Sequence, residues 1–325
     1  MSNRVPTVTV IVPARPGESR IQALEAVQQL DYPRESLEMI VARGKQPSVQ
    51  RNAAIKAARG DLIYFLDDDS RPVRESLRHA TGHFTNPQVK MVGGPAVCPK
   101  DAPWIEQLFA VVLSSWLAVA SSRARYTPVG KLRESGEKEL ILCNLISRRD
   151  VLLELGGFDE SLYPNEENAL MDNIQKRGGK LLYDPEMIAE RRPRPTLWAF
   201  IKMLLTYGRG RAEQFRLHPT AGSILNFVPP LFCVYLVALL ITFAFRPHGD
   251  IVARIATWPL AAYGLLLLVD TLLSIPRHRL VRTLAAMPLI ILTHICYGLG
   301  FWRGLFTRLH RKVAQSDVVL EQVRW

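Results

Sequence analysis

Three consecutive aspartates, Asp67, Asp68 and Asp69, are the residues whose type and spacing most clearly fit a chemical role. They follow the apolar run 62–66, which is short and β-branched or aromatic enough to predict a buried strand. Like charges this close repel one another and resist burial. They become favourable if a divalent cation and a phosphate share the site, because carboxylate oxygens suit Mg²⁺ or Mn²⁺. The alternative is a solvated acidic turn that caps a helix beginning after Pro72.

The elements around these aspartates are predicted to alternate between strand and helix. Strands are expected at residues 8–12, 37–42, 62–66 and 90–92, and helices at 18–30, 49–59 and 73–84. This β-α-β-α-β order predicts an α/β fold with a mostly parallel sheet and right-handed crossovers. The carboxyl edge of that sheet would collect Pro13-Ala14-Arg15, Arg43-Gly44-Lys45 and the aspartates. Such an edge offers cations for phosphate and anions for a metal, as a nucleoside diphosphate requires.

The last third of the chain is predicted to enter a membrane. The sequence has 325 residues, 48% of them hydrophobic, and the apolar excess lies in three runs at 224–245, 255–275 and 283–302. Each run is long enough, at roughly 20 residues, to cross the hydrocarbon core as a helix. The expected organisation is a catalytic domain at 1–215 (a nucleotide half at about 1–100, an acceptor half at about 101–215), a membrane domain at 216–312 and a tail at 313–325.

The net charge of +11 points to the same place. Basic residues gather before the first apolar run, at Arg191, Arg192, Arg194, Lys202, Arg209, Arg211 and Arg216. Basic residues beside a span mark the cytoplasmic side and attract anionic membrane lipids. The chain carries no zinc, helix-turn-helix or RNA-binding signature, so nucleic acid is not an expected partner. We therefore expect a multi-pass protein of the inner (cytoplasmic) membrane whose catalytic domain faces the cytoplasm.

Two points of topology stay open at this level. The stretch 104–122 is amphipathic to apolar and predicts an interfacial or core helix near the acceptor entrance, with a fourth span as the alternative. Three full spans would place the basic tail (Arg308, Arg311, Lys312) outside, against the charge rule. A re-entrant or tilted third segment would keep the tail in the cytoplasm.

Four stretches carry motifs in a fixed order. They are Val10–Arg15, then Gln50–Ile55 with Ala57–Asp61, then Leu66–Asp69, and last Ser147–Arg149, Gly156–Glu160 and Glu166–Leu170. Together they resemble the family 2 glycosyltransferases of GT-A fold, in particular the membrane-anchored bacterial enzymes that build exopolysaccharide on a lipid carrier. The resemblance covers about residues 7 to 215.

The resemblance implies an inverting transfer of a sugar from a nucleotide-sugar donor to a lipid-linked, polyprenyl-type acceptor, assisted by Mg²⁺ or Mn²⁺. Carried onto this sequence, it assigns the metal to Asp69 with Asp67, the nucleotide-sugar to Pro13, Ala14, Arg15, Arg51, Asp67 and Asp68, the catalytic base to Glu167, and the acceptor to Asn144, Glu166, Arg209 and Arg211. The competing interpretation of Glu166 and Glu167 is an exposed helix N-terminus, where acidic residues are favoured by the helix dipole.

The sequence departs from the family pattern at three places. The second strand ends in Ala42-Arg43-Gly44 where the family usually has an aspartate, so the donor base is left open. The family's Glu-Asp pair is Glu166-Glu167, and the histidine that often completes the metal shell is absent from the stretch Glu190–Arg194. Two alternatives follow: a polyprenyl-phosphate glycosyltransferase that uses the bare lipid phosphate, and a non-catalytic membrane scaffold that retains the fold.

Overall fold

The structure is a computed structural model. It describes residues 5–162, 165–217, 219, 221–245, 250–307, 309 and 317–323. By its internal contacts the chain divides into two compact units: a first unit of Met1–Ala102, Ser121–Arg192 and His310–Trp325, and a second unit of Pro103–Ala120 and Pro193–Leu309. This division differs from the expected boundary near residue 215. Residues 103–120 belong to the second unit, and the C-terminal strand belongs to the first.

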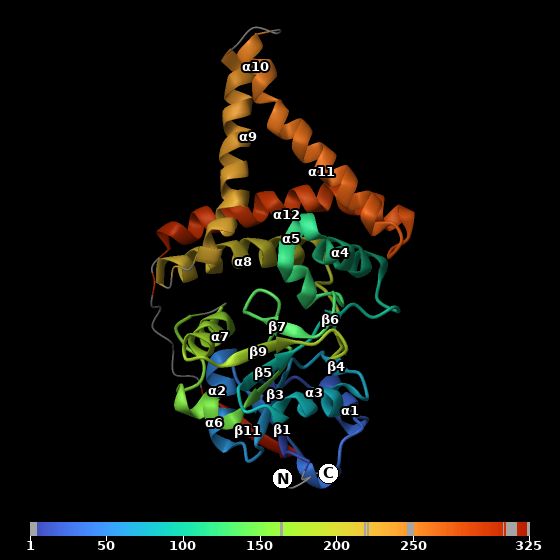
Figure 1. Ribbon diagram of the computed structural model, residues 1–325, viewed down its shortest axis with the longest axis vertical. Coiled ribbons are helices and arrows are strands. Elements are labelled where there is room, and N and C mark those ends of the chain that lie inside the picture. The colour runs from blue at the N-terminus through green and yellow to red at the C-terminus, as the bar shows by residue number, and fades with distance from the viewer. Residues whose placement is uncertain are drawn as a thin grey trace. The chain divides into compact units, whose positions relative to one another are not determined.

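The first unit is built on an eight-stranded sheet of order β11-β2-β1-β3-β8-β5-β9-β7 (Figure 1). Its strands are β1 (Val8–Ala14), β2 (Leu37–Arg43), β3 (Leu62–Leu66), β5 (Val89–Gly93), β7 (Arg133–Ser135), β8 (Asn144–Arg148), β9 (Lys180–Tyr183) and β11 (Val319–Val323). Strand β1 pairs in parallel with β2 and β3, as the alternating pattern predicts. Strand β8 then runs antiparallel to both β3 and β5. A three-stranded sheet, β4-β10-β6, is formed by β4 (Arg71–Pro72), β10 (Ala189–Glu190) and β6 (Ala96–Val97).

Helices cover both faces of the large sheet. They are α1 (Gln22–Gln28), α2 (Pro47–Ala57), α3 (Ser76–Gly82), α6 (Arg149–Glu154) and α7 (Glu166–Lys176), with 3₁₀ turns at η1 (Arg34–Ser36), η2 (His83–Thr85) and η3 (Ala120–Arg125). Strand β3 is buried at all five positions. Its alternate residues face two separate cores, one with α1 and α3 and one with α2, α6 and α7. The predicted α/β fold class is confirmed.

The C-terminal strand belongs to this sheet. Strand β11 pairs antiparallel with β2 along its five residues, and Glu321 accepts a hydrogen bond from Arg43 Nε at 2.7 Å. The pairing covers the edge of β2, which would otherwise present unpaired backbone groups. The tail charges named in the sequence, Arg308, Arg311 and Lys312, lie outside the described residues.

The second unit is helical. Its elements are α4 (Trp104–Ser114), α5 (Trp116–Val119), α8 (Leu197–Leu217), η4 (Ala221–Phe227), α9 (Val228–Phe245), α10 (Ile251–Ala256), α11 (Trp258–Ser274) and α12 (Leu280–Phe306). In the described residues, three helical segments are long and apolar enough to cross a membrane: Ile224–Phe245, Ile251–Ser274 and Leu280–Phe306. The stretch expected to form one helix from residue 104 is bent by 66° between α4 and α5, and counts as a fourth candidate only if the bent pair is one span.

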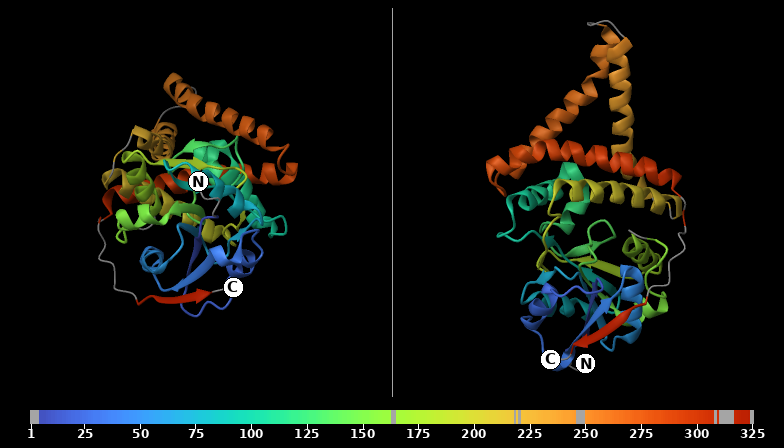
Figure 2. Two further views of the ribbon diagram at one scale, coloured as in Figure 1. Left: turned by 60° about the horizontal axis from the view of Figure 1, so that its bottom comes forward. Right: turned by 180° about the vertical axis from the view of Figure 1, so that it is seen from behind.

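Helices α8 and α12 lie side by side along much of their length (Figures 1 and 2). Glycines allow this approach. A Cβ added at Gly208 would lie 2.1 Å from the carbonyl oxygen of Tyr297, and one added at Gly300 would lie 2.2 Å from that of Leu205. Small residues bring helix backbones together in this way in apolar surroundings, where packing replaces the hydrophobic effect.

The charge inside the second apolar run has a structural partner. Asp270 on α11 is 1% exposed and accepts hydrogen bonds from the Ser115 hydroxyl at 2.8 Å and the Leu117 amide at 3.4 Å. His294 on α12 bonds the Leu117 carbonyl through Nε2 at 2.9 Å and the Tyr263 hydroxyl through Nδ1 at 2.8 Å. These side chains satisfy backbone groups freed where α4 ends and α5 begins, which apolar surroundings require.

The glycine contact gives a test of the second unit. Gly300→Ala should lower the stability of that unit by about 1–3 kcal/mol, because the new methyl group forces two backbones apart. Thermal unfolding in detergent would measure it. Gly264→Ala on α11 is the matched control: a Cβ there meets nothing within 4 Å, so the change should cost nothing and add up to about 1 kcal/mol of helix propensity. Equal melting temperatures for the two variants would contradict the packing argument.

Candidate active site

The three aspartates lie at the end of β3, immediately before β4. All three are half-buried. Burial, reinforced by the charges of Asp69 and Asp67, raises the pKa of Asp68 above its ordinary value. The backbone carbonyl of Asp68 accepts a hydrogen bond from Ala23 at the start of α1. The turn is therefore fixed by backbone contacts, and its carboxylates form a concentrated anionic site.

Arg51 on α2 joins this site to a second acidic group. Its guanidinium reaches Asp67 Oδ1 at 3.2 Å through Nη2 and Glu166 Oε1 at 3.3 Å through Nη1. The Arg51 side chain is 7% exposed and that of Glu166 4% exposed. A buried charge is tolerated only when it is paired, and breaking such a pair costs about 3–5 kcal/mol. Arg51 thus holds β3 and α7 in a fixed relation.

The next residue on α2 holds the same half of the unit. Asn52 donates from Nδ2 to the Phe158 carbonyl at 2.8 Å and to Glu160 at 2.9 Å, and its Oδ1 accepts from the Phe158 amide at 2.8 Å. The Gly-Gly-Phe-Asp-Glu motif is therefore docked on α2 through one side chain. Two adjacent residues of one helix turn position both acceptor-half motifs.

Arg191, just after β10, clamps the aspartates from the other side. Its Nη2 lies 2.9 Å from Asp67 Oδ2 and its Nε 3.0 Å from Asp69 Oδ1. Burial alone would lower the pKa of Arg191, but neighbouring negative groups, Asp67 and Asp69 among them, outweigh it and raise that pKa above its already high value. One cation therefore sits where oxygens from both aspartates converge.

The chemistry of these two carboxylates suits a divalent metal. Oxygens of Asp67 and Asp69 both bind the guanidinium of Arg191, through different nitrogen atoms, and hard oxygen donors suit Mg²⁺ or Mn²⁺. Asp69 and Asp67 are the residues that would hold the ion. Arg191 occupies the stretch in which the sequence lacks a histidine, and its contact with the aspartates is an interaction that the sequence did not reveal.

The acidic pair at the start of α7 is asymmetric. Glu166 is buried, and burial together with the charge of Glu167 raises its pKa to about 7, against the influence of Arg51. Its second oxygen accepts from the Asn165 amide at 3.1 Å. Glu167 is only partly buried. The competing interpretation, an exposed helix N-terminus, is therefore wrong for Glu166.

Asn165, which precedes the pair, is strained. Its φ is +126°, a conformation that costs a residue other than glycine about 1–3 kcal/mol. Its Oδ1 accepts a hydrogen bond from the side chain of Asn168 at 2.8 Å. Among the described residues, its buried Nδ2 atom has no hydrogen-bond partner. Stored strain of this kind concentrates at functional sites.

The remaining predicted site residues are distributed unevenly. Pro13 and Ala14 end β1, and the exposed Arg15 follows them. The Arg15 carbonyl accepts a hydrogen bond from Arg43, which also binds the Glu18 carbonyl at 2.7 Å. This places the β1 loop at the same sheet edge as the aspartates.

Asn144, predicted to contact the acceptor, makes its hydrogen bonds inside the protein. It is fully buried; its Oδ1 accepts from the Tyr64 hydroxyl at 2.8 Å, and its Nδ2 donates to the Pro95 carbonyl at 3.1 Å and the Met187 carbonyl at 2.7 Å. Both amide protons are therefore used inside the protein. Arg209 and Arg211 lie on α8 in the second unit, near Glu213 at 3.5 Å and Gln214 at 3.0 Å respectively.

Comparison with known proteins places the fold and motifs in a family. The profile of glycosyl transferase family group 2 matches residues 62–302. The pre-mycofactocin glycosyltransferase of Mycobacterium tuberculosis is 28% identical over 187 residues, 56% of this chain and 38% of that protein. The succinoglycan biosynthesis protein ExoA of Rhizobium meliloti is 26% identical over 209 residues, 63% of this chain and 58% of that protein. The matched regions thus span less than two thirds of these relatives.

Among solved structures, mannosyltransferase PcManGT from Pyrobaculum calidifontis, in complex with GDP-Man and Mn²⁺, has a similar fold. Its TM-score is 0.62 at 18% identity, over 94% of this chain and 88% of that one. The chain belongs to glycosyl transferase family group 2, and its first unit has the GT-A fold that the motifs predict.

The Arg191 clamp gives the second test. Arg191→Gln should tighten Mn²⁺ binding at the aspartates at least about fivefold, because like charges 4 Å apart repel by roughly 1 kcal/mol even in water. Titration followed by electron paramagnetic resonance would measure the affinity. Arg71→Gln removes the same charge from β4, where the arginine pairs with Glu190 at 2.9 Å, and is the control. Unchanged Mn²⁺ affinity in Arg191→Gln would mean that the guanidinium and the ion do not compete for these carboxylates.

Proposed function

We propose that this chain is a membrane-anchored inverting glycosyltransferase that moves a sugar from a nucleotide-sugar donor to a lipid-linked acceptor. One observation carries the proposal: Arg51 ties Asp67 of the aspartate triplet to Glu166 at the start of α7. The groups that would hold a leaving diphosphate and the groups that would activate an acceptor are thereby placed in one site.

We assign the donor site to the carboxylates of Asp67 and Asp69. PcManGT was solved with GDP-Man and Mn²⁺, and a similar donor and ion suit the oxygens of Asp67 and Asp69 here. When bound, the ion would supply Lewis-acid stabilisation of the leaving diphosphate. Arg191, once displaced from these carboxylates, would be a second positive charge available to the diphosphate, and Arg15 is an exposed cation directly after β1. Such fixed charges favour the negative charge that develops on the leaving group.

We assign the activation of the acceptor to the start of α7. An inverting transfer needs a base that takes the proton of the acceptor hydroxyl while the bond between sugar and phosphate breaks on the opposite face. Glu167 is our choice, because both oxygens of Glu166 are engaged, one with Arg51 and one with the Asn165 amide. Glu166 then acts as a positioning residue: it fixes the first turn of α7 and so the direction of Glu167.

The acceptor class rests on the membrane helices and on one relative. ExoA is by name a succinoglycan biosynthesis protein, and an acceptor carried on a polyprenyl lipid suits a catalytic unit joined to apolar helices. Arg209 and Arg211 on α8 are cations that suit the phosphates of such a lipid. Another relative is by name a pre-mycofactocin glycosyltransferase, so a different class of acceptor is one competing outcome, and the bare lipid phosphate is another.

We infer the membrane topology from β11. Because β11 is a strand of the catalytic sheet, both ends of the second unit return to the same side of the membrane. The chain between them then crosses an even number of times, and one of the three candidate segments does not cross. We assign this role to α12, since it packs along α8, whose Lys202, Arg209, Arg211 and Arg216 forbid a span.

Helices α9 and α11 then form the transmembrane hairpin. They meet at α10 and diverge toward α12 (Figure 1). In the segments Ile224–Phe245 and Ile251–Ser274, 11% of the most apolar part is buried, whereas in α12 the share is 39%. Their outward apolar side chains suit lipid. The catalytic unit and β11 face the cytoplasm, the side that supplies nucleotide-sugars.

Transfer itself is the test of the proposal. Radiolabelled donors would be offered to the full chain in nanodiscs. The acceptor would be a lipid-linked saccharide, polyprenyl phosphate, or no added lipid acceptor. Product on the lipid-linked saccharide alone supports the proposal, and product on the bare phosphate supports its alternative. Asp69→Asn is the inactive control. No transfer and no donor cleavage under any of these conditions would leave the scaffold interpretation.

The base assignment predicts different effects for the two glutamates. Glu167→Gln keeps the size of the side chain but removes the proton acceptor, and should lower kcat by about 10²-fold or more with donor affinity unchanged. Glu166→Gln should lower kcat less and reduce the melting temperature more, since Arg51 loses a charged partner. Steady-state kinetics and calorimetry would separate these effects. An inactive Glu166→Gln beside an active Glu167→Gln would transfer the base role to Glu166.

The topology predicts which sites an impermeant thiol reagent reaches in intact cells. In a cysteine-free background, Asp250→Cys before α10 should be labelled, whereas Arg277→Cys before α12 and Gln322→Cys in β11 should react only after permeabilisation. Each site serves as the control for the others. If intact cells label only one of the last two variants, Arg277→Cys or Gln322→Cys, then α12 crosses the membrane.

A further inference from the structure

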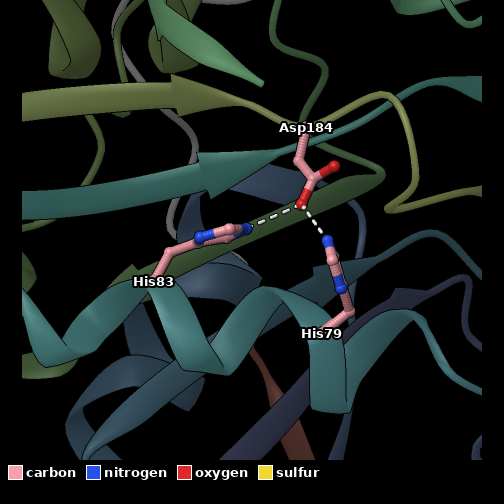
Figure 3. Close-up of side chains that lie close together, drawn as sticks. All are labelled: His79, His83 and Asp184. Carbon is pink, nitrogen blue, oxygen red and sulfur yellow. Dashed lines mark hydrogen bonds and ion pairs between the residues drawn. The ribbon is translucent and has the colours of Figure 1, made fainter. Parts of the chain in front are cut away.

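A second cluster of metal-ligating side chains lies in the first unit, on the face of the sheet that carries α3. His79 on α3 and His83 at the start of η2 are four residues apart, so their side chains lie on one helix face. Asp184, just after β9, faces them (Figure 3). The ligand atoms of the three residues all lie within 4.8 Å of one another. None of them belongs to the aspartate triplet or to α7.

The geometry of the cluster is convergent. His83 Nε2 lies 2.7 Å and His79 Nε2 3.0 Å from the same atom, Asp184 Oδ2. The ligand atoms of a tetrahedral zinc site are roughly 3.3 Å apart, given bonds of about 2.0–2.1 Å. Small movements of two imidazoles would therefore admit an ion between the three atoms. Glu186, whose carboxylate lies 3.5 Å from His79 Nε2, is within reach of a fourth position.

The surroundings of the cluster favour a ligand role for Asp184. Its side chain is 1% exposed, and its other oxygen, Oδ1, accepts a hydrogen bond from the Glu186 amide at 2.9 Å. That bond orients the carboxylate and leaves Oδ2 for the histidines, as outer partners do in metal sites. The His79 side chain is 45% exposed, which provides an entry path for an ion.

We propose that His79, His83 and Asp184 form a binding site for a zinc-type transition metal, separate from the catalytic ion. Two imidazoles and a carboxylate are a donor set for Zn²⁺, Co²⁺ or Ni²⁺, whereas Mg²⁺ and Mn²⁺ prefer oxygen alone. The site links α3 to the segment that runs from β9 through β10 to Arg191. A metal there would fix the backbone that delivers Arg191 to Asp67 and Asp69.

This proposal does not depend on the glycosyltransferase reaction. Its test uses the full chain without a histidine tag, in detergent and stripped of metal, titrated with Zn²⁺ against a chromogenic chelator. One Zn²⁺ should bind per chain, and His79→Ala, His83→Ala and Asp184→Asn should each weaken binding at least about tenfold. Co²⁺ should give the visible absorption of a tetrahedral site, and each variant should abolish it.

Two controls separate this site from others. Asp31→Asn removes a carboxylate that lies 3.0 Å from Arg78, which is on the same helix as His79. This change should leave Zn²⁺ binding unchanged. Asp69→Asn should also leave it unchanged, which distinguishes the cluster from the aspartate site. At 100-fold excess over Kd, Zn²⁺ should raise the melting temperature of the wild type by about 5 °C or more, and that of His83→Ala much less.

Two results would overturn the proposal. One is the absence of one-to-one Zn²⁺ binding at micromolar metal by the wild type. The other is binding that His79→Ala and His83→Ala, shown to be folded by circular dichroism, leave unchanged. In either case the cluster would be a hydrogen-bonded His-Asp-His contact that holds α3 to the segment after β9.

Discussion

The burial of one positive charge governs the arrangement of the first unit. Arg51 is almost without solvent, so its guanidinium must remain between Asp67 and Glu166 or lose several kcal/mol of stability. Because α2 carries Arg51 and the adjacent Asn52, the same helix turn fixes the aspartate triplet, the Gly-Gly-Phe-Asp-Glu motif and the start of α7. Segments separated by more than 100 residues in sequence are thus held in one site by two neighbouring side chains.

The aspartate triplet depends on this cation and on a second one. Arg51 and Arg191 both contact Asp67, and Arg191 also contacts Asp69. Without them the three carboxylates would repel one another, and the raised pKa of Asp68 reflects what remains of that repulsion and of burial. Arg51 also pairs with Glu166, so the two arginines do not balance the four carboxylates, and the site keeps a net negative charge when all four are ionised. Charge balance, more than shape, decides what it can bind.

The second unit meets a different constraint, because its helices expose many large apolar side chains. Asp270, a buried acidic residue of an apolar run, and the buried His294 bind the backbone where α4 gives way to α5. Glycines bring α8 and α12 into backbone contact. Both devices satisfy polar groups or gain packing without a hydrophobic driving force. They also explain how a helix with several arginines can accompany one that is apolar enough to span a membrane.

The sequence by itself determined the elements whose signal is local. The strand 62–66, the parallel β-α-β-α-β order and the three apolar helices follow from periodicity and run length, and the family follows from short motifs that keep their order. Tertiary structure alone decided which charges meet. Nothing local distinguishes Arg191 from its neighbours Arg192 and Arg194, gives Asn144 three internal partners, or brings His79 and His83 to Asp184. It also joined β11 to β2, because strand pairing across more than 270 residues is set by the exposed edge of a sheet, which no local pattern encodes.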